Sequence, residues 1–173
     1  MPRLSGALRR GLIAGTALLA LMAGPAFADG DYTVFIAGQE RGAMTVRTDP
    51  TGLRESAFRF VDRGRGPETT TRLRVDAEGL PVLLSVEGVS YYKTAVAESA
   101  GRTGDVITWK SEADAGSGPA GTFYLANEAD AEIGAALARA LIKAPGGELT
   151  LLPGGKARIE KSAERTIPGA DGP

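Results

Sequence analysis

The stretch "NEADAEIGAALARALIKA", residues 127–144, is where the hydrophobic pattern of this sequence changes. Apolar residues there recur with a helical period, at Ile133, Leu137, Ala140, Leu141 and Ala144. Asn127 suits the N-cap, and Asp130 suits the positive end of a helix. Lys143 suits the last turn, and "PGG" at residues 145–147 ends it. The sequence therefore predicts one amphipathic helix over residues 127–144.

The segments before this helix have the pattern of β-strands. They alternate apolar and polar residues, or are rich in β-branched and aromatic residues, and turn residues separate them. The predicted strands are residues 31–37, 43–48, 53–62, 69–76, 82–99 (one long strand or two, interrupted at Gly88), 106–112 and 122–126. After the helix, residues 148–152 and 157–161 predict a final hairpin.

Three connections are predicted with particular shapes. Residues 38–42, "GQERG", resemble a hairpin loop with a polar tip between two glycines. Residues 49–52, "DPTG", predict a tight turn, because proline presets φ and glycine accepts a positive φ. Residues 113–121, "ADAGSGPAG", predict a small-residue loop.

Helices do not alternate with strands in this pattern, which argues against a parallel βαβ architecture. The alternation predicts sheets with one buried and one solvated face. The expected fold is mainly β with one late α-helix: a curled antiparallel sheet, or half-barrel, with the helix packed on its concave face.

The first 28 residues have the pattern of a cleavable signal peptide. Arg3, Arg9 and Arg10 precede an apolar run over residues 11–24, and Ala26-Phe27-Ala28 offers small residues to a signal peptidase. The run falls short of the roughly 20 residues that a membrane-spanning helix needs. We expect export to the periplasm or the cell exterior, by the Sec or the twin-arginine route, with residues 29–161 as one β-rich domain and residues 162–173 as a tail or linker.

Composition excludes several kinds of chemistry. The chain contains no histidine and no cysteine. Histidine-dependent catalysis, thiol catalysis, thiolate metal sites and disulfides are therefore impossible within it. Residues 29–173 keep seventeen of the twenty Lys and Arg residues and all twenty-one Asp and Glu residues, a net charge of −4. A mildly acidic domain is a poor nucleic-acid binder, and we expect no nucleic-acid partner and no transmembrane segment.

The stretch "FVDRGRGPET", residues 60–69, allows two interpretations. A phosphate-binding loop would need its glycines to lead into a helix N-terminus, whereas this stretch leads into a strand. Gly64 and Gly66 then serve a connection between two strands, and Arg63 and Arg65 point into solvent or onto carboxylates. Anion binding by these arginines is the alternative.

The mature chain also resembles a known family. The segments that carry the resemblance are "YTVFIAGQERGAMTV", "FRFVDRGRGPETTTRLRVDAEGLPVLLSVEGVSYYKTAVAE", "TWKSEAD" and "FYLANEADAEIGAALARALIKAPGGELTLLPGGKARIEK". They resemble the N-terminal, β-rich segment of large exported bacterial amidohydrolases, in which a metal-dependent barrel follows. The first hairpin is similar, more loosely, to periplasmic half-barrel domains related to lipoprotein carriers.

The resemblance implies a scaffolding or docking domain rather than an enzyme. The family's metals are bound in the barrel by a His-x-His pair, further histidines, an aspartate and often a modified lysine, none of which can be assigned in this sequence. We therefore expect no catalytic residue, cofactor or metal in this chain, and a covalently following barrel as its partner.

The residues expected at a docking or ligand-facing surface are Arg63, Arg65, Tyr92, Lys93 and Trp109. The alternative is a free-standing periplasmic half-barrel that binds an apolar small ligand or lipid between sheet and helix. Its expected cavity residues are Phe58, Phe60, Trp109 and Leu137.

Overall fold

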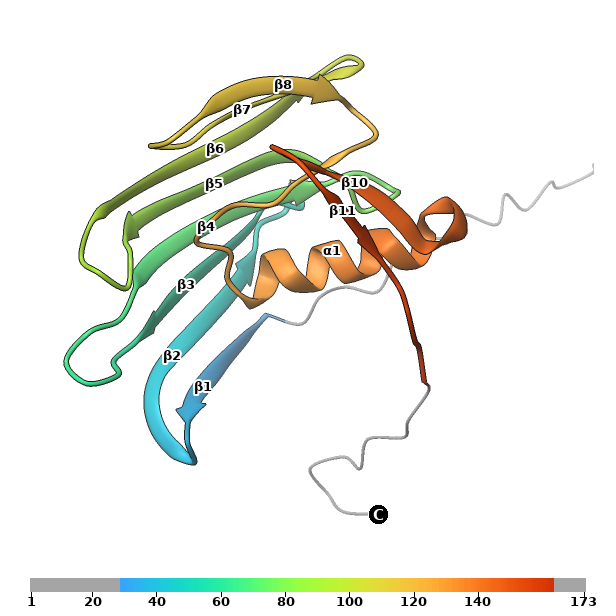
Figure 1. The fold of residues 1–173 in the computed structure, drawn as a ribbon. Coiled ribbons are helices and arrows are strands. Elements are labelled where there is room, and N and C mark those ends of the chain that lie inside the picture. Colours follow the sequence, from blue (N-terminus) through green and yellow to red (C-terminus); the bar gives the residue numbers. More distant parts are fainter. Residues whose placement is uncertain (1–28, 164–173) are drawn as a thin grey trace, which may run out of the picture.

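A computed structural model describes residues 29–163 of the chain (Figure 1). Eight antiparallel strands pair in the order in which they occur in the sequence. They are β1 (Gly30–Ile36), β2 (Gln39–Thr48), β3 (Arg54–Phe60), β4 (Glu68–Val75), β5 (Pro81–Val89), β6 (Ala95–Thr103), β7 (Val106–Lys110) and β8 (Ala115–Pro119). The sheet curls but does not close into a barrel.

The rest of the described chain lies against the inside of this curl. Helix α1 (Ala131–Lys143) crosses the concave face, and a 3₁₀ turn, Pro145–Gly147, follows it (Figure 1). A small three-stranded sheet flanks the helix and consists of β9 (Phe123–Tyr124), β10 (Glu148–Leu152) and β11 (Lys156–Arg158). The predicted fold class, a curled antiparallel sheet with one late helix on it, is thus confirmed.

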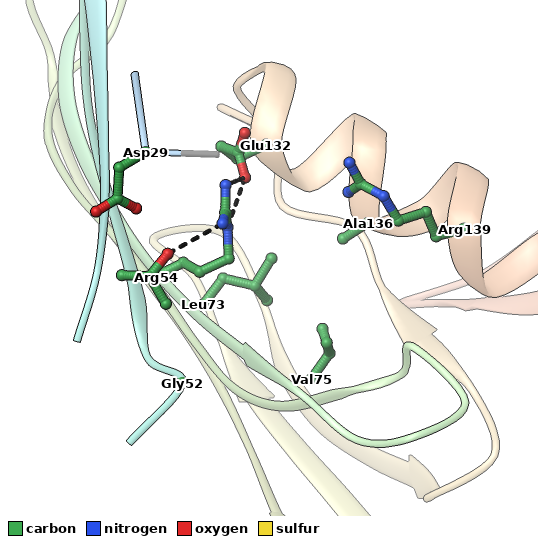
Figure 2. Close-up of a pocket in the computed structure, with 9 residues that line it drawn as sticks. Asp29, Gly52, Arg54, Leu73, Val75, Glu132, Ala136 and Arg139 are labelled. Carbon is green, nitrogen blue, oxygen red and sulfur yellow. Dashed lines mark hydrogen bonds and ion pairs between the residues drawn. The ribbon is translucent and has the colours of Figure 1, made fainter. Parts of the chain in front are cut away.

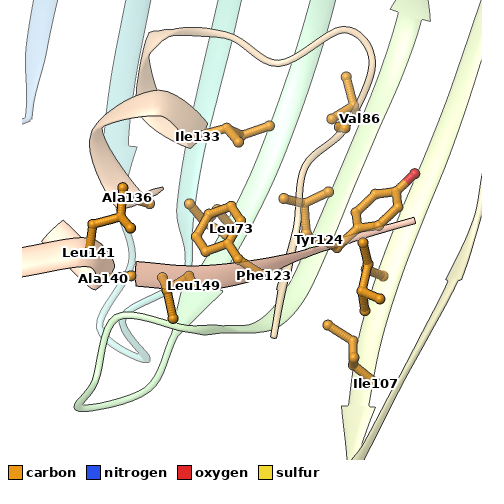
Figure 3. Close-up of a cluster of buried hydrophobic side chains, with 14 of the residues drawn as sticks. Leu73, Val86, Ile107, Phe123, Tyr124, Ile133, Ala136, Ala140, Leu141 and Leu149 are labelled. Carbon is orange, nitrogen blue, oxygen red and sulfur yellow. The ribbon is translucent and has the colours of Figure 1, made fainter. Parts of the chain in front are cut away.

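The core lies between the concave face and the elements that cover it (Figure 3). The sheet contributes one residue in two from its central strands, because successive side chains point to opposite faces. The buried residues from the sheet are Leu73, Leu84, Val86, Val96, Ala100 and Ile107. Those from the covering elements are Phe123, Tyr124, Ala126, Ile133, Ala136, Ala140, Leu141, Leu149 and Leu152.

Several predicted boundaries were wrong. The first hairpin turns on two residues, Ala37 and Gly38, both with positive φ, so the expected five-residue loop is mostly strand β2. A bulge follows, since Val34 pairs with Gly42 and Phe35 with Glu40. The long segment over residues 82–99 is two strands that turn at residues 90–94, rather than at Gly88.

Two other predictions failed for clearer physical reasons. The expected small-residue loop contains strand β8, whose residues "AGSGP" have low β propensity and pair with β7 through the backbone. The helix begins at Ala131 instead of 127, because Asp130 rather than Asn127 is the N-cap. The Asp130 carboxylate accepts from the backbone N–H groups of Glu132 and Ile133 at 3.0 and 3.1 Å.

Gly42 is a position where a side chain does not fit. A Cβ atom there would lie 2.0 Å from the carbonyl oxygen of Arg59 and 2.5 Å from Cα of Phe60. We expect Gly42→Ala to lower the free energy of unfolding by about 2 kcal/mol, since the paired backbone would have to shift. Gly134→Ala is the matched control in α1, where nothing lies within 4 Å of the added Cβ. It should stabilise the helix by about 0.5–1 kcal/mol. Urea unfolding measures both, and equal effects would contradict the prediction.

Among residues 29–163, no helix is long and apolar enough to cross a membrane. The expected signal peptide, residues 1–28, and all but the first two residues of the expected tail lie outside the described residues.

Candidate functional site

A cavity of about 380 Å³ lies between α1 and the first half of the curled sheet (Figure 2). Its apolar wall comes from Leu73 and Val75 on β4 and Ala136 on α1. The remaining lining residues are Asp29, Thr48, Gly52, Arg54, Glu132 and Arg139. The cavity therefore has an apolar wall and a rim of mixed charge.

Arg54 forms the most buried charged contact of this rim. Its Nε and one terminal nitrogen donate to Oε2 of Glu132 at 2.9 and 2.6 Å, and the other donates to Oγ1 of Thr48 at 3.1 Å. The side chains of Arg54 and Glu132 are only 8% and 12% exposed. This pair fixes the first turn of α1 over β3 and forms one side of the cavity.

Arg139 lies two turns further along α1, on the same side as Glu132 and Ala136. Figure 2 shows its guanidinium group reaching back along the helix toward Glu132. Burial lowers the pKa of Arg139, the negative charge of Glu132 opposes this, and the positive charge of Arg54 adds to it. The group remains protonated at neutral pH, as arginine does in proteins. Nearby negative charge stabilises the protonated form of an arginine that burial has partly removed from water.

A second polar contact ties the helix start to the sheet. Asp130, the N-cap of α1, accepts a hydrogen bond from the Ser56 hydroxyl, and both residues are buried. Ser56 follows Arg54 by two positions on β3, so both side chains point to the concave face. The helix is thus held on β3 at two consecutive inward positions.

Buried Glu98 of β6 holds the segment that leads into the helix. Its carboxylate accepts from the Tyr124 hydroxyl at 2.9 Å and from the backbone N–H groups of Asn127 and Glu128 at 3.0 and 3.2 Å. Burial, followed by the hydrogen bond to Glu98, raises the pKa of Tyr124. This contact is structural, since the carboxylate faces three donors of the same chain.

An aromatic row lies at the other end of the concave face, beyond the helix. We use this name for Phe58, Phe60, Tyr91 and Tyr92, whose ring centroids are 5.7, 6.2 and 5.2 Å apart in succession. Tyr92 is 73% exposed, and the other three rings are half-buried. Pairing of β4 with β5 brings the β3–β4 loop and the β5–β6 turn together at this end, because Glu68 pairs with Val89.

Basic side chains border the aromatic row. Lys93 has a positive φ of 65°, and its Nζ donates to the carbonyl oxygen of Gly66 at 2.7 Å, linking turn 90–94 to loop 61–67. Arg63 and Arg65 are exposed in that loop, which joins β3 to β4. The loop therefore connects two strands, as expected, and anion binding by its arginines stays a prediction. Four of the five predicted surface residues occur at this end of the sheet.

Trp109, the fifth, lies elsewhere. It is on β7 opposite Ala100, half-buried, and stacks on Tyr124 with ring centroids 6.2 Å apart. None of the four residues expected to line a cavity, Phe58, Phe60, Trp109 and Leu137, lines the 380 Å³ cavity. Trp109 and Leu137 instead pack against the core.

Alternation along β3 could have pointed to the cavity residues that sequence analysis missed. Alternation puts Arg54 and Ser56 on the same face of this strand as Phe58 and Phe60, which were expected to line a cavity. An arginine at an inward position needs a charged partner, and Glu132 in the first turn of the helix was available. Among residues 29–163, no group of three or more carboxylates could hold a metal ion.

No protein-family model, curated protein or solved structure matches this chain. The chain forms an open antiparallel half-barrel with a covering helix. Its concave face carries two candidate sites: the 380 Å³ cavity beside α1, called the α1 cavity below, and the aromatic row.

Proposed function

We propose that this chain is an exported, non-catalytic domain that docks on an amidohydrolase barrel which follows it in the same polypeptide. The aromatic row carries the proposal. It combines a largely exposed tyrosine with three half-buried rings and three basic side chains, at the end of the sheet that α1 leaves uncovered. Aromatic and arginine side chains are enriched where proteins contact one another.

The side chains of the aromatic row and its basic neighbours indicate which groups the surface of a docking partner should carry. An apolar patch would pack on Tyr92 and Tyr91, and carboxylates would lie opposite Arg63 and Arg65. Lys93 is already hydrogen-bonded to Gly66, so its contribution is to hold the two loops in place. The resemblance to the leader domains of exported amidohydrolases supports a barrel as that partner.

Sequencing the coding DNA beyond Pro173 is the first test. The proposal expects the frame to continue into a barrel with a His-x-His pair near its start. A stop codon directly after Pro173 would contradict a covalently attached partner.

Tyr92→Ser tests the surface in that longer protein. We expect it to lower the midpoint of thermal unfolding of the barrel by a few degrees, because a ring at the domain contact is lost. The same substitution in the 173-residue chain should change little, since Tyr92 is mostly exposed there. Phe35→Ser is the control, because Phe35 is 64% exposed on β1, outside the aromatic row. Identical unfolding of both variants and the parent protein would exclude this surface.

A second candidate function is the binding of an apolar small ligand between sheet and helix. The α1 cavity favours it, because 380 Å³ is within the range of small-molecule sites, about 300–1,000 Å³. The two functions use different surfaces, and either can be tested without the other.

A further inference from the structure

The α1 cavity has an apolar wall and a rim in which positive and negative charges balance. We propose that it binds one uncharged aliphatic molecule of medium length, such as an alcohol or ester, and excludes charged molecules of the same size. This inference rests on the second candidate function and names its ligand class. It is independent of docking through the aromatic row.

The volume limits the size of the ligand. A cavity of about 150 Å³ holds one benzene molecule, so 380 Å³ has room for on the order of a dozen heavy atoms. An aliphatic chain of about eight carbons with a small head group is of that size, so chain and head group would both lie inside. A diacyl lipid would leave most of its two chains outside.

The apolar wall accounts for the chain of the ligand. Leu73 is almost fully buried and Val75 is half-buried, and both point inward from β4. Ala136 faces them from α1, and its small side chain leaves the space open (Figure 2). Each CH₂ group that enters this space should tighten binding about fourfold, because its removal from water is favourable.

The charges of the rim balance within the chain. Two acidic residues, Asp29 and Glu132, and two basic residues, Arg54 and Arg139, line the cavity. Arg54 donates two hydrogen bonds to Glu132, and the charges of Arg139 and Glu132 attract each other. Both arginines have further interactions within the chain. The lining therefore carries no net charge for a ligand to neutralise.

A charged head group would be penalised in this cavity. It would lose hydration on entering, and no net counter-charge would compensate that loss. It would also compete for the Arg54–Glu132 pair, in which both side chains are mostly buried and each depends on the other. An uncharged ligand avoids both costs, so the cavity should select against carboxylate and ammonium ions that carry the same chain.

Titration calorimetry of the purified chain tests this selectivity. Octan-1-ol, octanoate and octylammonium share one chain length and differ in charge. We expect octanol to bind at least tenfold more tightly than either ion, and hexan-1-ol to bind about fifteenfold more weakly than octanol. Either ion binding as tightly as octanol would overturn the exclusion of charge and leave the second candidate function intact. No binding by any probe would overturn both.

Substitutions test the location. Ala136→Leu should abolish octanol binding by filling the cavity, and Val75→Phe should do so from the sheet side. Ala138→Leu, on the exposed side of the same helix, is the matched control and should leave binding unchanged. Circular dichroism establishes that each variant is folded. Unchanged octanol binding in a folded Ala136→Leu or Val75→Phe would overturn the site.

A change of one lining charge tests the reason for the selectivity. Glu132→Gln keeps an acceptor for Arg54 and leaves the lining with a net positive charge. It should shift the preference between octanoate and octanol at least tenfold toward octanoate. Glu55→Gln, in the exposed pair with Arg72 on the convex face, should not shift it. An unchanged preference in a folded Glu132→Gln would overturn charge balance as the cause of the exclusion.

Discussion

Glu98→Ala is expected to lower the free energy of unfolding by about 2–4 kcal/mol, because it leaves one buried hydroxyl and two part-buried backbone N–H groups without their acceptor. Glu98 is 2% exposed, and its carboxylate accepts three hydrogen bonds, one from the Tyr124 hydroxyl and two from the backbone at Asn127 and Glu128. Each buried donor left unsatisfied costs about 1–3 kcal/mol. Urea unfolding followed by circular dichroism measures the loss.

Two milder variants separate this contact from simple loss of volume. Tyr124→Phe removes one donor and keeps the carboxylate, and we expect a cost of about 1–1.5 kcal/mol. Glu98→Gln keeps the size but turns an NH₂ group toward a donor, so its cost should lie between those of Tyr124→Phe and Glu98→Ala. A cost below about 1 kcal/mol for Glu98→Ala would show that water replaces the carboxylate and that the contact does not hold the chain before α1.

Glu132→Ala is expected to cost about 3 kcal/mol, because it leaves the Arg54 guanidinium in a site where both partners are mostly buried. Glu55→Ala is the matched control. Glu55 pairs with Arg72 at 2.8 Å on the convex face, where the two side chains are 52% and 46% exposed. Exposed pairs contribute little, so its loss should cost under about 1 kcal/mol.

A double variant tests the reason for the cost. Arg54→Met combined with Glu132→Leu removes both charges, and replacement of a buried pair by apolar residues is often neutral or stabilising. The double variant should therefore be more stable than Glu132→Ala alone. A double variant as unstable as the single one would mean that packing around Arg54, rather than the loss of its charge contact with Glu132, destabilises the protein.

The sequence predicted most elements of the fold because their signals are local. Alternation predicted strands with one buried face, and Met44, Val46 and Leu73 are buried on that face of their strands. Strand β8 was missed because its pairing depends on the backbone of β7 rather than on its own side chains. The helix start was misplaced by four residues, since two residues of capping type compete and the hydrogen bond to Ser56 favours Asp130.

The candidate site was harder to predict because it depends on contacts between distant parts of the chain. The aromatic row joins residues from two connections that sheet pairing brings together, and the loop motifs around Arg63 and Lys93 indicated this surface. The cavity joins β4 to a helix that lies about sixty residues later. Alternation along β3 puts Arg54 on the inward face, but no periodicity within either segment shows which inward residues of the sheet and the helix will face each other, so the cavity itself became visible only in the structure.

The strand order has a consequence for how the protein folds. Each of the eight strands pairs with its neighbour in the sequence, so every ladder can form as soon as the next strand is available. The concave face, however, obtains its cover from residues 122–158, at the far end of the described chain. A growing chain would therefore hold an assembled but uncovered sheet, and its Leu- and Val-lined side would be exposed to aggregation until the last third of the domain is present.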